Sequence, residues 1–107
     1  MSPQPRIAEY FADFGARLAR LVHVLGVEIE PPTISSRVAA EVLELAGTVA
    51  HTSERKFAPL ASFVTGIAVG ELRAAGRLAS DREIAALVAQ LRTELDASIA
   101  SQPPDGT

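Results

Sequence analysis

The chain contains no cysteine among its 107 residues. This absence excludes a disulfide framework and any metal site built on thiolates. The only imidazole ligands are His23 and His51, so the composition predicts neither a resident metal nor a cofactor. A chain without cysteine is compatible with the reducing cytoplasm, which is the location we expect.

An excess of positive charge is also missing. The formal net charge is −3 and the isoelectric point is near 5.3, so no broad basic field is present to attract nucleic acid or an anionic membrane. The main apolar run, residues 57–70, is shorter than the roughly 20 residues that cross a bilayer. Arg6, Glu9 and Asp13 interrupt the start of the chain, where a secretory signal needs an apolar core. The sequence therefore predicts neither a nucleic-acid partner nor a membrane.

Recognisable catalytic motifs are absent as well. The chain has no nucleophile elbow, no phosphate-binding glycine loop, no HExxH and no zinc-ligand spacing. His51 falls on the same helical face as Glu44 and Thr48, but one histidine and one carboxylate do not make a metal site. Whether His51 and Glu44 form a functional pair is left open. We expect Glu41 to lie with Glu44 on the solvated face of the same helix.

The chain does contain the composition and the apolar periodicity that predict helices. Its apolar fraction of 48% and charged fraction of 21% are those of a folded globular domain. Apolar residues recur three and four apart in stretches that predict helices over residues 5–25, 36–51, 59–75 and 80–100, with Pro31 and Pro32 separating the first two. We expect one all-α domain over residues 1–100, a small four-helix bundle, and a disordered C-terminal tail over 101–107.

Local signals mark several boundaries and one close contact. Ser80 and Glu83 have the spacing of a capping box, which begins the fourth helix. Gly26 and Gly76 are suited to end the first and third helices. Gly15 lies inside the first helix, where glycine costs about 1 kcal/mol relative to alanine, so it predicts the close approach of a neighbouring helix.

The third helix dominates the predicted bundle. The segment from Phe57 to Gly70 carries no charge and is apolar nearly all round, so we expect it to be buried on several sides, by the other helices or by a second copy of the chain. Its large side chains recur three and four residues apart and form a stripe along the helix. The stripe comprises Leu60, Phe63, Val64, Ile67 and Leu72.

Gly66 and Gly70 place two small residues on one side of this helix, where another backbone can approach closely. Packing within the chain is one explanation. The other is a homodimer seam, for which Phe63, Gly66, Ile67 and Gly70 are the candidate interface residues.

The polar segment before the third helix is the candidate ligand site. Ser53, Arg55 and Lys56 precede a helix amino terminus, where amide protons and the helix dipole favour an anion, and His51 lies nearby. A phosphate or carboxylate is the predicted ligand. The alternative is structural: Thr52 or Ser53 caps the helix, and Arg55 and Lys56 are solvated or paired with Glu54 and Glu44.

A resemblance to a known family rests on residues of the second and third predicted helices. These are Leu43, Leu45, Ala46, Val49, Ala50, His51, Glu54, Arg55, Ala58, Pro59, Leu60, Phe63 and the segment from Gly66 to Gly70. With these residues the two helices resemble a small uncharacterised helical family of actinobacteria, whose members are encoded beside, or fused to, the molybdenum cofactor guanylyltransferase. The resemblance implies an accessory or partner-binding role around molybdopterin nucleotide assembly, and it does not imply catalysis.

Two functions from different classes follow. The first is a non-enzymatic helical interaction or accessory module, acting in molybdenum cofactor biosynthesis and binding a protein partner or itself. The alternative is a small anionic-ligand site, for phosphate or a nucleotide, or an enzyme-like site, at the start of the third helix.

Overall fold

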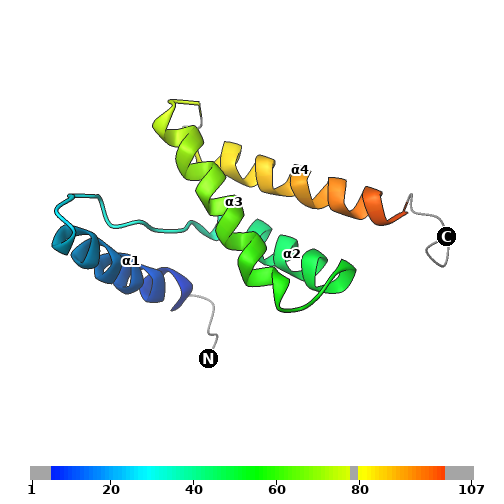
Figure 1. The fold of residues 1–107 in the computed structure, drawn as a ribbon, viewed down its shortest axis with the longest axis horizontal. Coiled ribbons are helices and arrows are strands. Elements are labelled where there is room, and N and C mark those ends of the chain that lie inside the picture. The colour runs from blue at the N-terminus through cyan, green and yellow to red at the C-terminus, as the bar shows by residue number, and fades with distance from the viewer. Residues whose placement is uncertain (1–5, 78–79, 101–107) are drawn as a thin grey trace. The chain divides into compact units, whose positions relative to one another are not determined.

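The computed structural model describes residues 6–77 and 80–100, which form four α-helices and, within these ranges, no strand. These are α1 (Arg6–Val24), α2 (Ser36–Thr52), α3 (Phe57–Ala74) and α4 (Asp81–Ala100) (Figure 1). The prediction of a small all-α bundle is confirmed, and the helix bounds differ from the predicted ones by at most two residues. The predicted tail, residues 101–107, lies outside the described ranges.

The chain divides into two compact units, one ending at Ser36 and the other beginning at Arg37. The first unit contains α1 and the linker that follows it. The second unit contains α3, α4 and all of α2 after its first residue. The expectation that all four helices form one domain stays a prediction.

In the first unit, the linker packs on one face of α1. Phe11, Phe14 and Leu18 of α1 line a small apolar groove together with Pro32 and other linker residues. The rings of Phe11 and Phe14 are 5.6 Å apart between centroids, a distance typical of favourable aromatic contact. The linker therefore covers part of the apolar face of α1, and Phe14 and Leu18 remain 44% and 39% exposed.

Gly15 is buried against this linker. A Cβ atom at this position would overlap the carbonyl oxygen of Pro32. The close approach predicted from the glycine is present, but the neighbour is an extended backbone segment and not a helix, so that part of the expectation is wrong. The Pro31-Pro32 pair favours an extended chain, which can lie flat on the helix.

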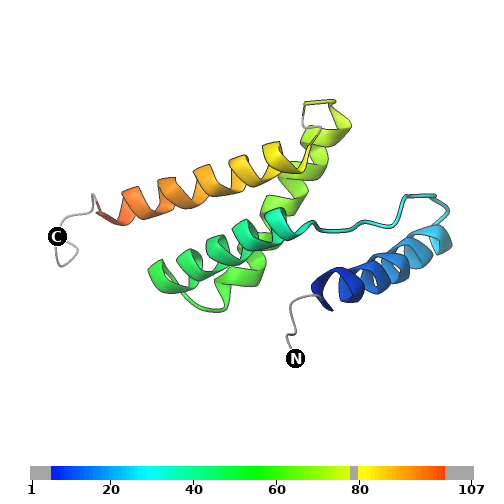
Figure 2. The same cartoon turned by 180° about the vertical axis from the view of Figure 1, so that it is seen from behind.

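In the second unit, α3 crosses α2 and α4, which run in the same general direction (Figure 2). The core forms where α2 meets α4. Leu45 and Val88 are fully buried, and Val49 and Ile84 join them in one cluster. All four belong to the amphipathic stripes of α2 and α4, whose opposite faces are polar, so burial of one face follows from the sequence pattern.

The predicted helix ends are confirmed. The Ser80 amide donates to Glu83 Oε1 at 3.1 Å, and the Glu83 amide donates to Ser80 Oγ at 3.2 Å, which completes the capping box of α4. Gly26 and Gly76 have φ angles of 93° and 73°, in the left-handed region that glycine adopts without steric cost.

A polar contact between α2 and α4 is made by Glu41 and Arg92. Glu41 Oε1 lies 3.7 Å from Arg92 Nη2, and both side chains are about 30% exposed. The expectation that Glu41 lies on the solvated face of α2 is therefore wrong. The long arginine side chain reaches across the helix interface, which periodicity within α2 alone does not reveal.

Candidate interaction surface

The start of α3 is made by backbone turns. Its N-cap residue, Lys56, makes no side-chain capping bond. Instead the Phe57 amide donates to the Glu54 carbonyl at 2.9 Å, and the Ala58 amide donates to the Arg55 carbonyl at 3.1 Å. From there the helix runs to Ala74 and ends before Gly76.

The side of α3 that faces α2 and α4 carries small side chains. Ala61 and Val69 pack against the buried cluster, and Ser62 and Thr65 are half-buried beside them. Thr65 Oγ1 donates to the Ala61 carbonyl at 2.8 Å and Ser62 Oγ to the Ala58 carbonyl at 3.1 Å. Because these hydroxyls are satisfied by their own helix, the inner face of α3 needs no polar partner from α2 or α4.

The large apolar side chains of α3 are mostly exposed. Relative exposure is 71% for Phe63, 64% for Val64, 61% for Leu60 and 48% for Ile67. No residue of α3 is buried. We call the surface formed by Leu60, Phe63, Val64, Gly66, Ile67 and Gly70 the outer face of α3.

The predicted burial of α3 is thus corrected in part. Burial on several sides by the other helices, one of the two predicted possibilities, is not seen in the second unit, where only Leu72 of the stripe of large residues is half-buried. The reason lies in packing: α2 and α4 already bury each other's large residues, and a third helix approaches such a pair most closely through its small residues. Within the described residues of the second unit, nothing wraps α3 on several sides.

Both glycines of α3 lie open on this side. A Cβ atom at Gly66 or Gly70 would meet no other atom within 4 Å. Close packing of these glycines inside the chain, one of the two predicted explanations, is therefore not seen. The four residues predicted as a seam, Phe63, Gly66, Ile67 and Gly70, all belong to the outer face.

An open apolar groove of about 430 Å³ adjoins the outer face. Leu60 and Val64 line it from α3, and Leu91 and Leu95 line it from α4, above buried Leu45. The apolar surface therefore continues from α3 toward α4. Together, the groove and the outer face make the main exposed apolar surface of the second unit, and surfaces of this kind mark interaction sites.

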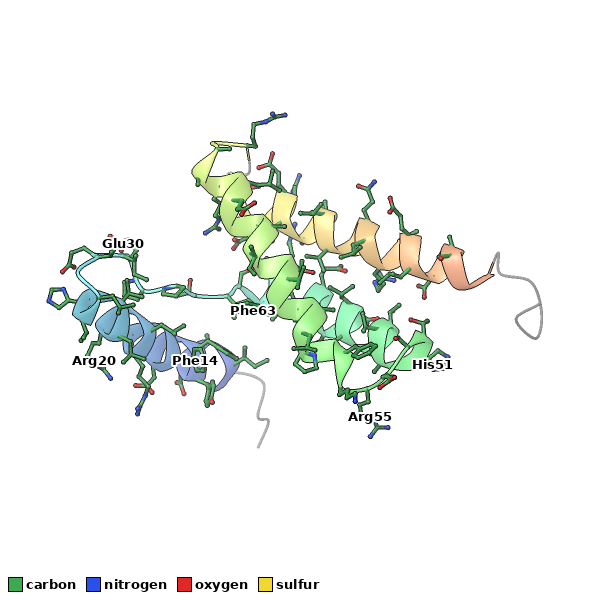
Figure 3. All side chains as sticks on the ribbon, in the orientation of Figure 1. Phe14, Arg20, Glu30, His51, Arg55 and Phe63 are labelled. Carbon is green, nitrogen blue, oxygen red and sulfur yellow. The ribbon has the colours of Figure 1, made fainter. Side chains whose placement is uncertain are left out.

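The predicted anion site occupies the connection from α2 to α3, where His51 and Arg55 are labelled in Figure 3. His51, Ser53, Arg55 and Lys56 are all exposed, and Lys56 Nζ lies 3.7 Å from Glu54 Oε1. The first amides of α3 do not point to a free site, since those of Phe57 and Ala58 are bonded within the turn. The third residue of the helix, Pro59, has no amide proton. The anion site stays a prediction, without the amide donors that motivated it.

His51 lies in a shallow groove with Glu44 and Thr48, as their spacing predicts, and Asp96 of α4 joins them there. Sequence periodicity could not reveal Asp96, because it comes from another helix. Within residues 6–77 and 80–100, no cluster of three or more histidine and acidic side chains is arranged to hold a metal ion. His23, the other histidine, is exposed and contacts Glu28.

In a comparison with protein families, residues 9–102 match a domain of unknown function, DUF6457. The chain belongs to this family. The DUF6457 match spans α1 to α4 and says nothing about molybdenum cofactor assembly or a source organism. No curated protein and no solved structure matches this DUF6457 chain. Among the described residues of the DUF6457 chain, no helix has the length and apolarity required to span a bilayer.

Proposed function

We propose that this DUF6457 chain is a non-enzymatic helical interaction module whose binding surface is the outer face of α3. The observation that carries the proposal is the exposure of the large apolar residues of this helix, which leaves Phe63, Val64 and Leu60 more than half exposed. Complete burial of a large apolar side chain contributes about 1.5–3 kcal/mol, so covering this face favours association.

The biological setting of the module is a second part of the proposal. The resemblance of α2 and α3 to helical proteins found beside the molybdenum cofactor guanylyltransferase supports an accessory role in that pathway. The absence of cysteine supports a cytoplasmic location. In this setting the guanylyltransferase is the first protein partner to test.

The experiment compares two substitutions at exposed apolar positions. Phe63→Asp places a charge on the outer face of α3, and Leu43→Asp places the same charge at a 66% exposed position on α2. Binding to the guanylyltransferase is measured by calorimetry, and self-association by sedimentation equilibrium. Phe63→Asp should abolish whichever association the wild-type chain shows, whereas Leu43→Asp should leave it within about twofold.

Two results would refute the proposal. One is a wild-type chain that associates neither with itself nor with the guanylyltransferase. The other is an association that Phe63→Asp leaves intact, because binding would then use another surface. Circular dichroism of both variants checks that the helices are retained.

The alternative, an anion site at the start of α3, has a separate test. Titration with inorganic phosphate, followed by amide NMR shifts, would reveal binding near Arg55 and Lys56. Because the first amides of α3 are already bonded, we expect no saturable shift there. Saturable binding that the double variant Arg55→Ala and Lys56→Ala removes would favour the anion site.

A further inference from the structure

We propose that the outer face of α3 packs against the same face of a second copy of the chain, with the two α3 helices antiparallel. This inference rests on the proposed function, because it names the occupant of the interaction surface. In the resulting seam, Arg55 of each copy lies beside Glu71 of the other.

The uncharged run of α3 supports a symmetric partner. No charged residue occurs from Phe57 to Gly70, so the face meets its own copy without burying an unpaired charge. A two-fold axis at the middle of this run, between Phe63 and Val64, places Leu60 of one helix opposite Ile67 of the other. The largest exposed side chains then cover one another.

Gly66 leaves space in this seam for the side chain of Phe63 from the other copy. In this register Phe63 of one copy lies about two residues along the axis from Gly66 of the other, on the same side of the seam. The absence of a Cβ at Gly66, and of any neighbour within 4 Å of that position, leaves room for the ring. A knob therefore meets a hole on both sides of the axis.

The charges that flank the run select the antiparallel orientation. Arg55 lies two residues before Phe57 and Glu71 lies one residue after Gly70, so the two are nearly equidistant from the middle. An antiparallel pair brings Arg55 of each copy to Glu71 of the other. A parallel pair would instead place arginine against arginine and glutamate against glutamate, which is unfavourable. The interaction between the two helix dipoles also favours the antiparallel orientation.

The first experiment is charge reversal in the full chain, with the dimer dissociation constant measured by sedimentation equilibrium. Arg55→Glu and Glu71→Arg should each weaken the dimer by roughly three- to thirty-fold, since each change affects two symmetry-related contacts. The double variant should restore the wild-type constant to within about threefold. Single variants that have no effect, or a double variant that is as weak as the singles combined, would overturn the antiparallel seam.

The second experiment measures whether the outer face of α3 is covered in the dimer. The chain has no tryptophan, so Phe63→Trp introduces a single fluorescent reporter on α3. We expect a dimer in which the emission of this reporter shifts to shorter wavelength as the concentration rises through the dissociation constant. Ile67→Glu in this background should give a monomer with the long-wavelength emission of exposed tryptophan, and Leu43→Glu should remain a dimer.

The remaining outcomes separate the two proposals. A dimer whose reporter stays exposed would overturn the seam, because the copies would then meet elsewhere. A monomer with an exposed reporter would overturn self-association and leave the face available to another protein. A monomer with a covered reporter would overturn both proposals, because the chain would then cover the face itself.

Discussion

Helices α3 and α4 are similar in length and both carry many apolar residues, but only α4 has residues that are buried. α4 buries Ile84, Ala85 and Val88, whereas α3 buries none of its residues. α4 has a charged outer side, so only one orientation keeps its charges in water. α3 has no such side, and its orientation is set by the fit of its small residues to α2 and α4. Apolar content therefore does not by itself determine burial.

The largest expected difference between the two regions comes from removing a leucine side chain from each. Leu45→Ala should lower the free energy of unfolding by about 2–5 kcal/mol, because Leu45 is fully buried and its loss leaves a cavity. Leu60→Ala should change it by less than about 0.5 kcal/mol, since Leu60 is 61% exposed. Chemical denaturation at low protein concentration, where association is negligible, measures both values.

Equal effects of these two substitutions would contradict the described core. A large loss at Leu60 alone would mean that α3 is buried in the folded chain. The matched chemistry of the pair removes differences in helix propensity, because leucine becomes alanine inside a helix in both variants.

A second comparison enlarges side chains on the two sides of α3. Ala61→Leu should destabilise the chain by about 1–3 kcal/mol, because Ala61 packs against the core cluster and larger side chains there force α3 outward. Ala68→Leu should be nearly neutral, since Ala68 is exposed. Thermal unfolding followed by circular dichroism distinguishes them. If Ala68→Leu were the more damaging change, the assigned inner face would be wrong.

The smallest expected effect on stability concerns N-terminal capping of α4 and α3. Ser80→Ala removes the capping box of α4 and should cost about 1 kcal/mol. Ser53→Ala, just before α3, should cost less than about 0.5 kcal/mol, because the N-cap of α3 is Lys56 and makes no side-chain capping bond. Both values come from urea denaturation. A larger loss at Ser53 would restore the structural role predicted for it from sequence.

Part of the fold follows from local sequence because local chemistry decides it. The ends of α1 and α3 depend on glycines that adopt positive φ, and the start of α4 depends on two side chains three residues apart. The stripes of α2 and α4 place Leu45 and Val88 in the core by the same local logic. Each of these features involves residues within one or two helical turns.

The candidate site was predictable only in part. Phe63, Gly66, Ile67 and Gly70 are identifiable as a possible seam from their spacing, and the structure places all four on the outer face of α3. The partners that come from other helices, such as Asp96 beside His51 and Arg92 beside Glu41, were not predictable. Contacts between distant segments carry no periodic signal in a single sequence.

The sequence by itself determined that this DUF6457 chain is helical, where its helices begin and end, and which faces of α2 and α4 are buried. Only the tertiary structure decided that Gly15 meets the backbone of Pro32 and that α3 turns its small residues inward. The physical reason is that α3 has no charged face to bias its rotation. Its orientation depends on how closely it can approach α2 and α4, and that distance is set by packing among residues far apart in the chain.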